Sequence, residues 1–157
     1  MKPKVYVETS VVSYLTARLS RDLIVAGHQQ VTQDWWQTHQ KSFDLVASQL
    51  VIQESSAGNP EAAQKRLDVL KTIELLQISE EALALSIKLV KGGPLPSKAA
   101  EDALHIAVAV TNGVDYLLTW NCAHIANASM RSRVESICRS NGYEPTIICT
   151  PEELMGE

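Results

Sequence analysis

Three carboxylates and one amide stand at positions in the chain from which they could act together on a substrate: Glu8, Glu54, Asp102 and Asn121. Carboxylates held a few ångströms apart repel one another and raise at least one pKa, whereas a divalent cation reverses this effect. Hard oxygen ligands without a cluster of histidines or cysteines suit Mg²⁺ or Mn²⁺ better than zinc. A metal-bound water at such a site can attack a phosphate, so these residue types predict metal-assisted hydrolysis of a phosphodiester.

The segment around Asp102 is the most informative stretch of the sequence. Ser97–Val110 reads SKAAEDALHIAVAV, and a helix that is apolar on most of its faces is usually buried. Pro96 followed by Ser97 predicts the start of this helix, with Ser97 as its N-cap. A carboxylate in the early turns also feels the positive end of the helix dipole. The sequence therefore predicts a charged acid in the interior, which needs a structural partner or a metal ion because an unpaired buried carboxylate is very costly.

Strand-like runs alternate with helical patterns along the whole chain. We expect strands at 4–7, 43–47, 75–78, 114–119 and 146–149. We expect helices from residue 9, over 32–40 with Thr32 as N-cap, from 48, over 61–72, from 79 to about 91, over 97–110 and over 128–141; the state of 18–30 is open. The alternation predicts a mainly parallel sheet with helices on both faces. Ligands bind beyond the carboxyl ends of the strands in such sheets, so we expect the four candidate residues to converge at that edge.

Composition narrows the class of protein. The chain has 157 residues, a length typical of one domain, and 45% of them are hydrophobic. It contains no apolar run long enough to span a membrane, and its N-terminus has no signal peptide pattern. The three cysteines have no C-x-x-C spacing, so we expect a reducing, cytoplasmic location. The absence of phosphate-cradling glycine motifs argues against a nucleotide-cofactor enzyme.

Four segments of the sequence resemble the PIN-domain family, and most strongly its VapC-type ribonuclease toxins: YVETSVVSYL near the N-terminus, IQE around Glu54, KAAEDALHIAVA around Asp102 and DYLLTWN around Asn121. The resemblance spans essentially the whole chain, and the third segment is its most specific part. It implies a single PIN-like domain over residues 1–157, with three α/β/α layers and a mainly parallel central sheet of four to five strands. It also implies an endoribonuclease that depends on Mg²⁺ or Mn²⁺.

The same resemblance assigns roles to individual residues. Glu8, Glu54 and Asp102 match the first three acids of the family, and Thr119 matches a supporting hydroxyl position. Glu8 is one methylene longer than the aspartate that the family usually has there, and Asn121 stands at the fourth acidic position without a charge. We expect Glu8 and Asp102 to bind the metal, with one tight metal at most, a weak second one and reduced activity.

The resemblance further implies an RNA substrate, a cognate antitoxin protein as partner and, as a family-level expectation, a homodimer. Lys91 and Lys98 flank the Gly-Pro turn before the central helix, and we expect them to contact RNA phosphates. The formal net charge of −4 argues against binding nucleic acid by bulk charge, but a local basic rim remains compatible with it. The alternative function is a catalytically weakened PIN scaffold that binds RNA or protein, which the neutral Asn121 and the longer Glu8 favour.

Several of these residues also have purely structural interpretations. Glu8 could cap the following helix, and Glu54 could be a solvated surface residue. His105 is more often a hydrogen-bonded core histidine than a ligand, and Glu101 is expected to be a solvated neighbour of Asp102.

Other aromatic and basic residues also have both a functional and a structural interpretation. Trp35 and Trp36 could stack RNA bases, although helix packing is the more frequent role, with at most one of the two in the core. Arg131, Arg133 and Arg139 are expected on the solvated face of their helix.

Overall fold

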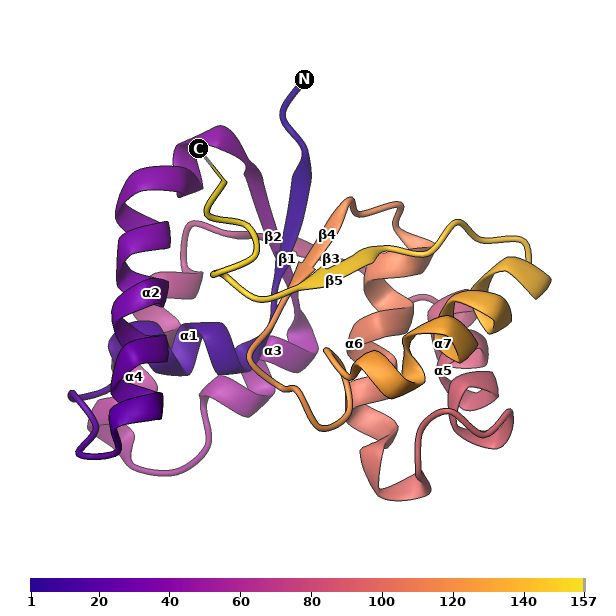
Figure 1. Cartoon of the computed structure of the whole chain (residues 1–157), viewed down its shortest axis with the longest axis horizontal. Coiled ribbons are helices and arrows are strands. Elements are labelled where there is room, and N and C mark those ends of the chain that lie inside the picture. Colours follow the sequence, from indigo (N-terminus) through magenta and orange to yellow (C-terminus); the bar gives the residue numbers. More distant parts are fainter. Residues whose placement is uncertain (157) are drawn as a thin grey trace.

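A five-stranded parallel sheet forms the centre of the computed structural model, which describes residues 1–156 (Figure 1). The strands are β1 (Lys4–Val7), β2 (Asp44–Ser48), β3 (Glu74–Leu76), β4 (Tyr116–Leu118) and β5 (Ile147–Cys149). Their order across the sheet is β3-β2-β1-β4-β5, and every neighbouring pair is parallel. The expected α/β class and strand number are confirmed, and β1, which lies in the middle, carries the start of the candidate site on its carboxyl end.

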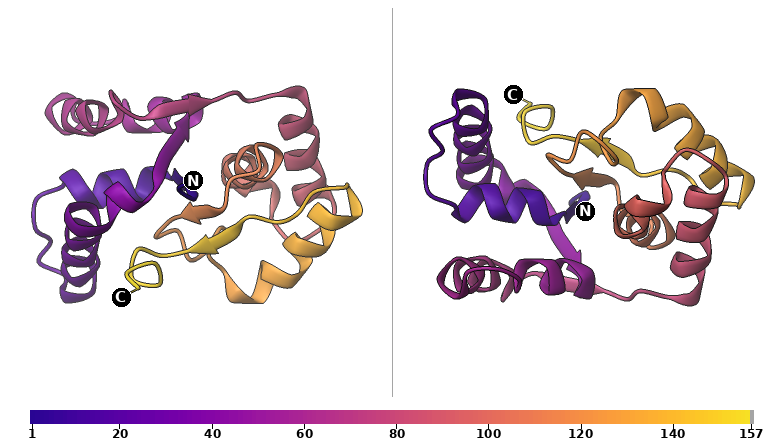
Figure 2. Two further views of the ribbon diagram at one scale, coloured as in Figure 1. Left: turned by 90° about the horizontal axis from the view of Figure 1, so that it is seen from above. Right: turned by 90° about the horizontal axis from the view of Figure 1, so that it is seen from below.

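The helices form two groups, one on each face of the sheet (Figures 1 and 2). The first group is α1 (Thr9–Thr16), α2 (Leu23–His39), α3 (Gln49–Ser55) and α4 (Pro60–Leu70). The second is α5 (Glu80–Lys91), α6 (Ala100–Thr111) and α7 (Ala128–Ser140). Short 3₁₀ turns cover Gln40–Ser42 and Ser97–Ala99. Right-handed crossovers explain this division, because the chain moves toward one edge of the sheet through β2 and β3 and toward the other through β4 and β5.

The core lies between the sheet and both helix groups. Val5, Tyr6 and Val7 are fully buried, as is expected of a central strand covered on both faces. Helix α6 is buried from Ala103 to Val110 apart from Leu104, which confirms the expected interior position of the central helix. No helix in the described part of the chain is both long and apolar enough to cross a membrane.

Two expected helix starts are wrong. Helix α2 begins at Leu23, and the carboxylate of Asp22 caps it by accepting hydrogen bonds from two backbone N–H groups, so the open segment 18–30 is largely helical. Thr32 lies inside this helix, and its hydroxyl donates to the carbonyl of His28. Ser97 does not cap the central helix, because it begins a 3₁₀ turn that leads into α6.

Candidate active site

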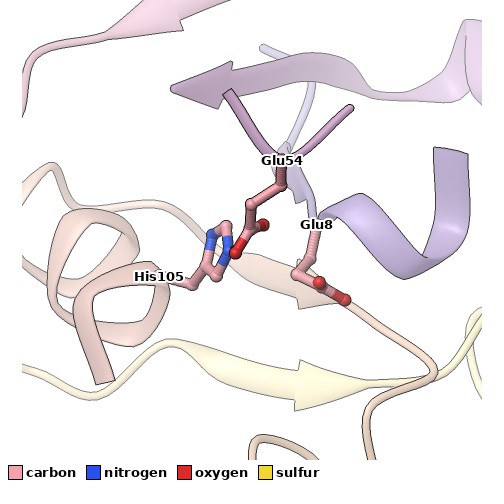
Figure 3. Close-up of side chains that lie close together, drawn as sticks. All are labelled: Glu8, Glu54 and His105. Carbon is pink, nitrogen blue, oxygen red and sulfur yellow. The ribbon is translucent and has the colours of Figure 1, made fainter. Parts of the chain in front are cut away.

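Three side chains from three different elements converge beyond the carboxyl ends of β1 and β2 (Figure 3). Glu8 follows β1 directly, Glu54 lies on α3 after β2, and His105 lies one turn into α6. One carboxylate oxygen of each glutamate and one ring nitrogen of His105 all lie within 4.8 Å of one another. Convergence at this edge follows from the topology, because the carboxyl ends of parallel strands share one side of the sheet.

Glu8 is a buried carboxylate, with only 5% of its surface exposed. Its Oε1 accepts hydrogen bonds from Ser10 Oγ at 2.5 Å and from Thr119 Oγ1 at 2.6 Å. Although Glu8 occupies the N-cap position of α1, its side chain makes no capping hydrogen bond. The helix-cap interpretation is therefore wrong, since the carboxylate turns into the site and two hydroxyls hold it there.

Glu54 is fixed by α1 and α6. Its Oε1 accepts from Thr9 Oγ1 and lies 2.8 Å from His105 Nε2. Because an ionised carboxylate only accepts, Nε2 carries the proton in this pair. His105 is fully buried, and its Nδ1 lies 2.7 Å from the hydroxyl of Tyr6, which in turn lies 2.7 Å from Ser48 Oγ. The expectation that His105 hydrogen-bonds within the fold is confirmed, and its protonated Nε2 makes it a holder of Glu54 rather than a free metal ligand.

The pKa values at this end of the sheet report competing effects. Burial raises the pKa of the Glu54 carboxyl, but hydrogen bonds from His105 and Thr9 and the charge of His105 outweigh it and leave the pKa below its ordinary value. Glu101 shares a hydrogen bond with Glu54, and this contact and the negative charge of Glu54 raise the pKa of Glu101. Burial raises the pKa of the Tyr6 hydroxyl, so that side chain stays neutral beside His105.

Asp102 lies beside this group and has partners of its own. Its Oδ1 accepts from Asn121 Nδ2 and its Oδ2 lies opposite His124 Nδ1, both at 3.1 Å. The backbone N–H of Asn121 donates to Thr119 Oγ1 at 2.9 Å, and that hydroxyl donates to Glu8. Thr119 and Asn121 therefore connect Asp102 to Glu8, but Asp102 is not among the atoms that converge within 4.8 Å. The pairing of Glu8 and Asp102 as metal ligands stays a prediction.

The remaining candidates lie farther out. Lys91 and Lys98 are both exposed, and Lys91 lines a shallow apolar groove between α5 and the start of α6. Arg133 and Arg139 are exposed on α7, and Arg139 pairs with Glu144, in agreement with a solvated face. Arg131 is half-buried and departs from that expectation.

Sequence reasoning missed several residues of the site. Ser10, Thr9 and His124 bind the three acids, and Glu101 is exposed as expected but also contacts Glu54. A signal for Ser10 was present, since a hydroxyl two residues after a strand-end carboxylate can turn back to it. His124 shows a similar local signal, because its backbone N–H donates to Oδ1 of Asn121 three residues earlier.

The arrangement concentrates negative charge without a matching cation. Within residues 1–156, no lysine or arginine forms an ion pair with Glu8, Glu54, Glu101 or Asp102, whose only basic partners are histidines. The donor set is dominated by carboxylate oxygens at the end of a parallel sheet. Such oxygens fit a small hard cation such as Mg²⁺ or Mn²⁺, and the carboxyl contact between Glu54 and Glu101 is one that a cation would relieve.

Comparison with solved structures identifies the same architecture in two other chains. The chain is similar to a chain of the VapBC2 complex of Rickettsia felis, solved with a DNA fragment from its promoter, at a TM-score of 0.59 and 16% identity over 94% of this chain and 98% of that one. It is also similar to VapC20 of Mycobacterium tuberculosis, a toxin that cleaves the sarcin–ricin loop, at a TM-score of 0.61 and 14% identity over 79% of this chain and 95% of that one.

These similarities show the fold and agree with the resemblance drawn from the sequence. No protein-family model matches the sequence, and no curated protein matches it. The chain therefore has a VapC-type PIN fold, with an acidic group of side chains at the carboxyl edge of its sheet.

Proposed function

We propose that this chain is a metal-dependent endoribonuclease and acts as the toxin of a toxin–antitoxin pair in the cytoplasm. One observation carries the proposal: Glu8 and Glu54 bring carboxylate oxygens within 4.8 Å of one another at the edge of a parallel sheet where ligands bind. Asp102 and Glu101 add negative charge next to them. The similarity to VapC20, a toxin that cleaves the sarcin–ricin loop, supports the choice of RNA as substrate.

We assign the metal to the carboxylates of Glu8 and Asp102, with Glu54 as the third acid of the site. A bound Mg²⁺ or Mn²⁺ would supply an activated water and stabilise the negative charge that develops on the phosphate. The other residues act on these carboxylates. Ser10 and Thr119 fix Glu8, His105 and Thr9 fix Glu54, and Asn121 and His124 fix Asp102.

The same comparisons support the proposed partners. One similar chain comes from a VapBC complex, which supports a cognate antitoxin for this chain. We propose Lys91 and Lys98 as contacts to RNA phosphates, since both are exposed near the start of α6. A homodimer remains a proposal that rests on the resemblance.

A second candidate function is an RNA- or protein-binding module with weakened catalysis. The position of Asn121 favours it, because the amide spends its Nδ2 on Asp102 and contributes no charge to the site. A binding module would bind RNA or a partner protein in the presence of a chelator and would not turn over.

Cleavage of a mixed structured RNA by the purified chain in Mn²⁺ tests the proposal. We expect Asp102→Asn to lower the cleavage rate by about a hundredfold or more, because even the outer partners of metal ligands are worth roughly 10- to 100-fold. EDTA should abolish cleavage. Asp115→Asn is the matched control, since Asp115 accepts from the Lys4 backbone at the opposite end of the sheet.

Cleavage that survives in Asp102→Asn or in EDTA would mean a contaminant or a different site. No cleavage by the wild type, together with RNA binding, would favour the binding module. The toxin assignment has its own readout, since expression of the wild type but not of Asp102→Asn should arrest growth.

A further inference from the structure

Three aromatic rings form a nearly parallel cluster next to the carboxylates. Tyr14 lies on α1, His28 on α2, and Trp120 between β4 and Asn121. The ring centroids of His28 and Trp120 are 4.0 Å apart with planes 12° from parallel. Tyr14 lies 6.1 Å from Trp120 and 6.4 Å from His28, at 23° and 21°. We call these three residues the aromatic cluster.

The aromatic cluster is attached directly to the candidate active site. The backbone N–H of Trp120 donates at 2.8 Å to Ser10 Oγ, and the same hydroxyl donates to the carboxylate of Glu8. Ser10 and Tyr14 are four residues apart on α1, so they lie on the same face of that helix about one turn apart. The aromatic cluster therefore lies about one turn of α1 away from the hydroxyl that holds Glu8, close to any ligand that Glu8 binds.

The three rings of the aromatic cluster differ in burial, as is expected of a surface on which a further ring can stack. Trp120 is only 9% exposed, and its Nε1 donates to the buried hydroxyl of Thr32 at 2.7 Å, so its ring is held firmly in place. Tyr14 and His28 are half-buried. Within residues 1–156, neither the phenol of Tyr14 nor the imidazole of His28 forms a hydrogen bond, which leaves both polar ends open to solvent or to a ligand.

We infer that the aromatic cluster stacks an unpaired base of the RNA beside the phosphate that is cleaved; this inference rests on the proposed nuclease function. Every base has an aromatic face, so stacking on rings adds a contribution to the binding of single-stranded RNA that does not itself depend on charge. Stacking suits a chain whose net charge is −4 and which cannot rely on bulk electrostatic attraction. The polar ends of Tyr14 and His28 can then select among bases by hydrogen bonding to their edges.

This assignment replaces the tryptophan pair on α2 as the site of stacking. Trp35 is completely buried in the core, as expected for one of the two, and packs on Phe43. Trp36 is half-buried and lines a cavity of about 450 Å³ with Lys4 and Asp44, which begin β1 and β2. Both tryptophans are therefore unsuited to a base that reaches the carboxylates at the other end of the strands.

The test compares the binding of two short RNA strands by fluorescence anisotropy. One is an unstructured oligoribonucleotide, and the other is an abasic strand of the same length with the same phosphates. All variants are made in the Asp102→Asn background, in which the proposed cleavage is blocked. Tyr14→Leu removes the ring and retains bulk, Tyr14→Phe retains the ring, and His28→Gln removes the second ring independently. Tyr143→Leu makes the same change at a half-buried tyrosine beside α5 and α7.

We expect Tyr14→Leu to weaken binding of the base-bearing strand by roughly 5- to 100-fold and to leave the abasic strand unchanged, since stacking is lost and the phosphate contacts are not. His28→Gln should act in the same direction. Tyr14→Phe and Tyr143→Leu should stay within about twofold of the background. Thermal unfolding of each variant confirms that it is folded.

Three results would overturn the inference: equal binding of both strands in the background, an equal loss for both strands in Tyr14→Leu, or unchanged RNA binding in Tyr14→Leu and His28→Gln. Cleavage by the wild type is measured separately, so the two claims can fail independently. Base-dependent binding without cleavage would refute the nuclease function and support base stacking on the aromatic cluster. Cleavage by the wild type, with RNA binding unchanged in Tyr14→Leu and His28→Gln, would support the nuclease function and refute the stacking.

Discussion

Asn121 determines how much negative charge the site carries. Its Nδ2 donates to Asp102 and its Oδ1 accepts from the backbone of His124, so the amide uses both of its ends in the fold. An aspartate could still accept from His124, but it could not donate to Asp102 and would place a second carboxylate against it. Asparagine at this position therefore makes the metal-free site more stable at the expense of a fourth acid.

Asn121→Asp should lower the free energy of unfolding by about 1–3 kcal/mol without metal, because a donor is lost and two carboxylates then repel each other. Mn²⁺ should restore most of this loss. Urea denaturation in EDTA and in Mn²⁺ measures both effects. Asn127→Asp is the matched control, since it also removes an amide donor, here to the carbonyl of Ala123, while aspartate still caps α7; any loss of stability there should not respond to Mn²⁺. Equal losses with and without Mn²⁺ would contradict the interpretation.

The lowered pKa of Glu54 makes the free energy of unfolding depend on pH in the acid range. Hydrogen bonds and the charge of His105 hold its pKa in the folded chain below the ordinary value of 4.5. The stabilisation is therefore fully present above the ordinary pKa and is lost as the pH falls through the folded pKa, because the unfolded chain binds the proton first. We expect urea denaturation of Glu54→Gln to show a smaller loss of stability on acidification than the wild type. An identical acid dependence in both would refute the linkage.

The contribution of Glu101 to the free energy of unfolding should depend on pH with the opposite sign. Its pKa is raised by contact with Glu54, so its stabilising contribution is present at low pH and is lost as the pH rises through the folded pKa. Because the side chain is exposed, removal of its charge in Glu101→Gln should stabilise the metal-free protein at neutral pH by only a few tenths of a kcal/mol, about the scale of a surface ion pair.

At the scale of elements, the site depends on where α1, α3 and α6 lie relative to the carboxyl ends of the central strands. Helix α6 places Asp102 and His105 one turn apart, and α1 places Thr9 and Ser10 between the other two acids. The second helix group is fixed at the end of α5, where Gly92 packs against α7. A Cβ at Gly92 would lie 2.6 Å from the carbonyl oxygen of Lys88 and 2.9 Å from Cδ1 of Ile137.

Gly92→Ala should therefore destabilise the fold by about 1–3 kcal/mol, as overpacking against backbone usually does. Gly27→Ala is the opposite case, because Gly27 lies inside α2 with open space at its Cβ position. Alanine there should stabilise by up to about 1 kcal/mol through helix propensity. Urea denaturation of the two variants measures the contrast, and a stable Gly92→Ala would show that α7 yields easily.

How far the sequence predicts the structure also differs between elements. The alternation of strands and helices is local and periodic, so all five strands and the central helix were predictable within a few residues. The start of α2 was not, because Gly27, His28 and two glutamines interrupt its apolar pattern. Only the structure shows that Asp22 caps this helix with its side chain.

In the site, the convergence of Glu8 and Glu54 was predictable, the role of Asp102 as a metal ligand stays a prediction, and the partners of the acids were largely not predictable. Glu8 follows a strand end, Glu54 lies on the helix after the next strand, and Asp102 lies near the start of a buried helix, which the pattern of the chain displays. Apart from the bond of Ser10 to Glu8, their hydrogen bonds join residues 19 to 111 positions apart, as between Asp102 and Asn121 and between Glu8 and Thr119. Such pairings depend on side-chain rotamers in the folded chain and leave no spacing signal. The same holds for the aromatic cluster, whose three members come from three elements.

At the scale of the whole molecule, the fold gathers the acids of the candidate site near the carboxyl ends of the central strands. The acids, the residues that hold them and the aromatic cluster all lie around the carboxyl ends of β1, β2 and β4. A cation that binds only the folded chain would therefore stabilise the entire protein in proportion to the logarithm of its concentration. This links the proposed chemistry to global stability.

The most direct test of the account measures Mn²⁺ binding itself, from the loss of the free-ion signal in electron paramagnetic resonance. The wild type and Glu8→Gln are compared, since glutamine keeps the size and an acceptor for Ser10 and Thr119 but removes the charge. We expect one Mn²⁺ bound per wild-type chain, a rise in thermal stability with Mn²⁺ concentration, and the loss of both in a folded Glu8→Gln. Equal Mn²⁺ binding by the two proteins, or none by the wild type, would contradict it.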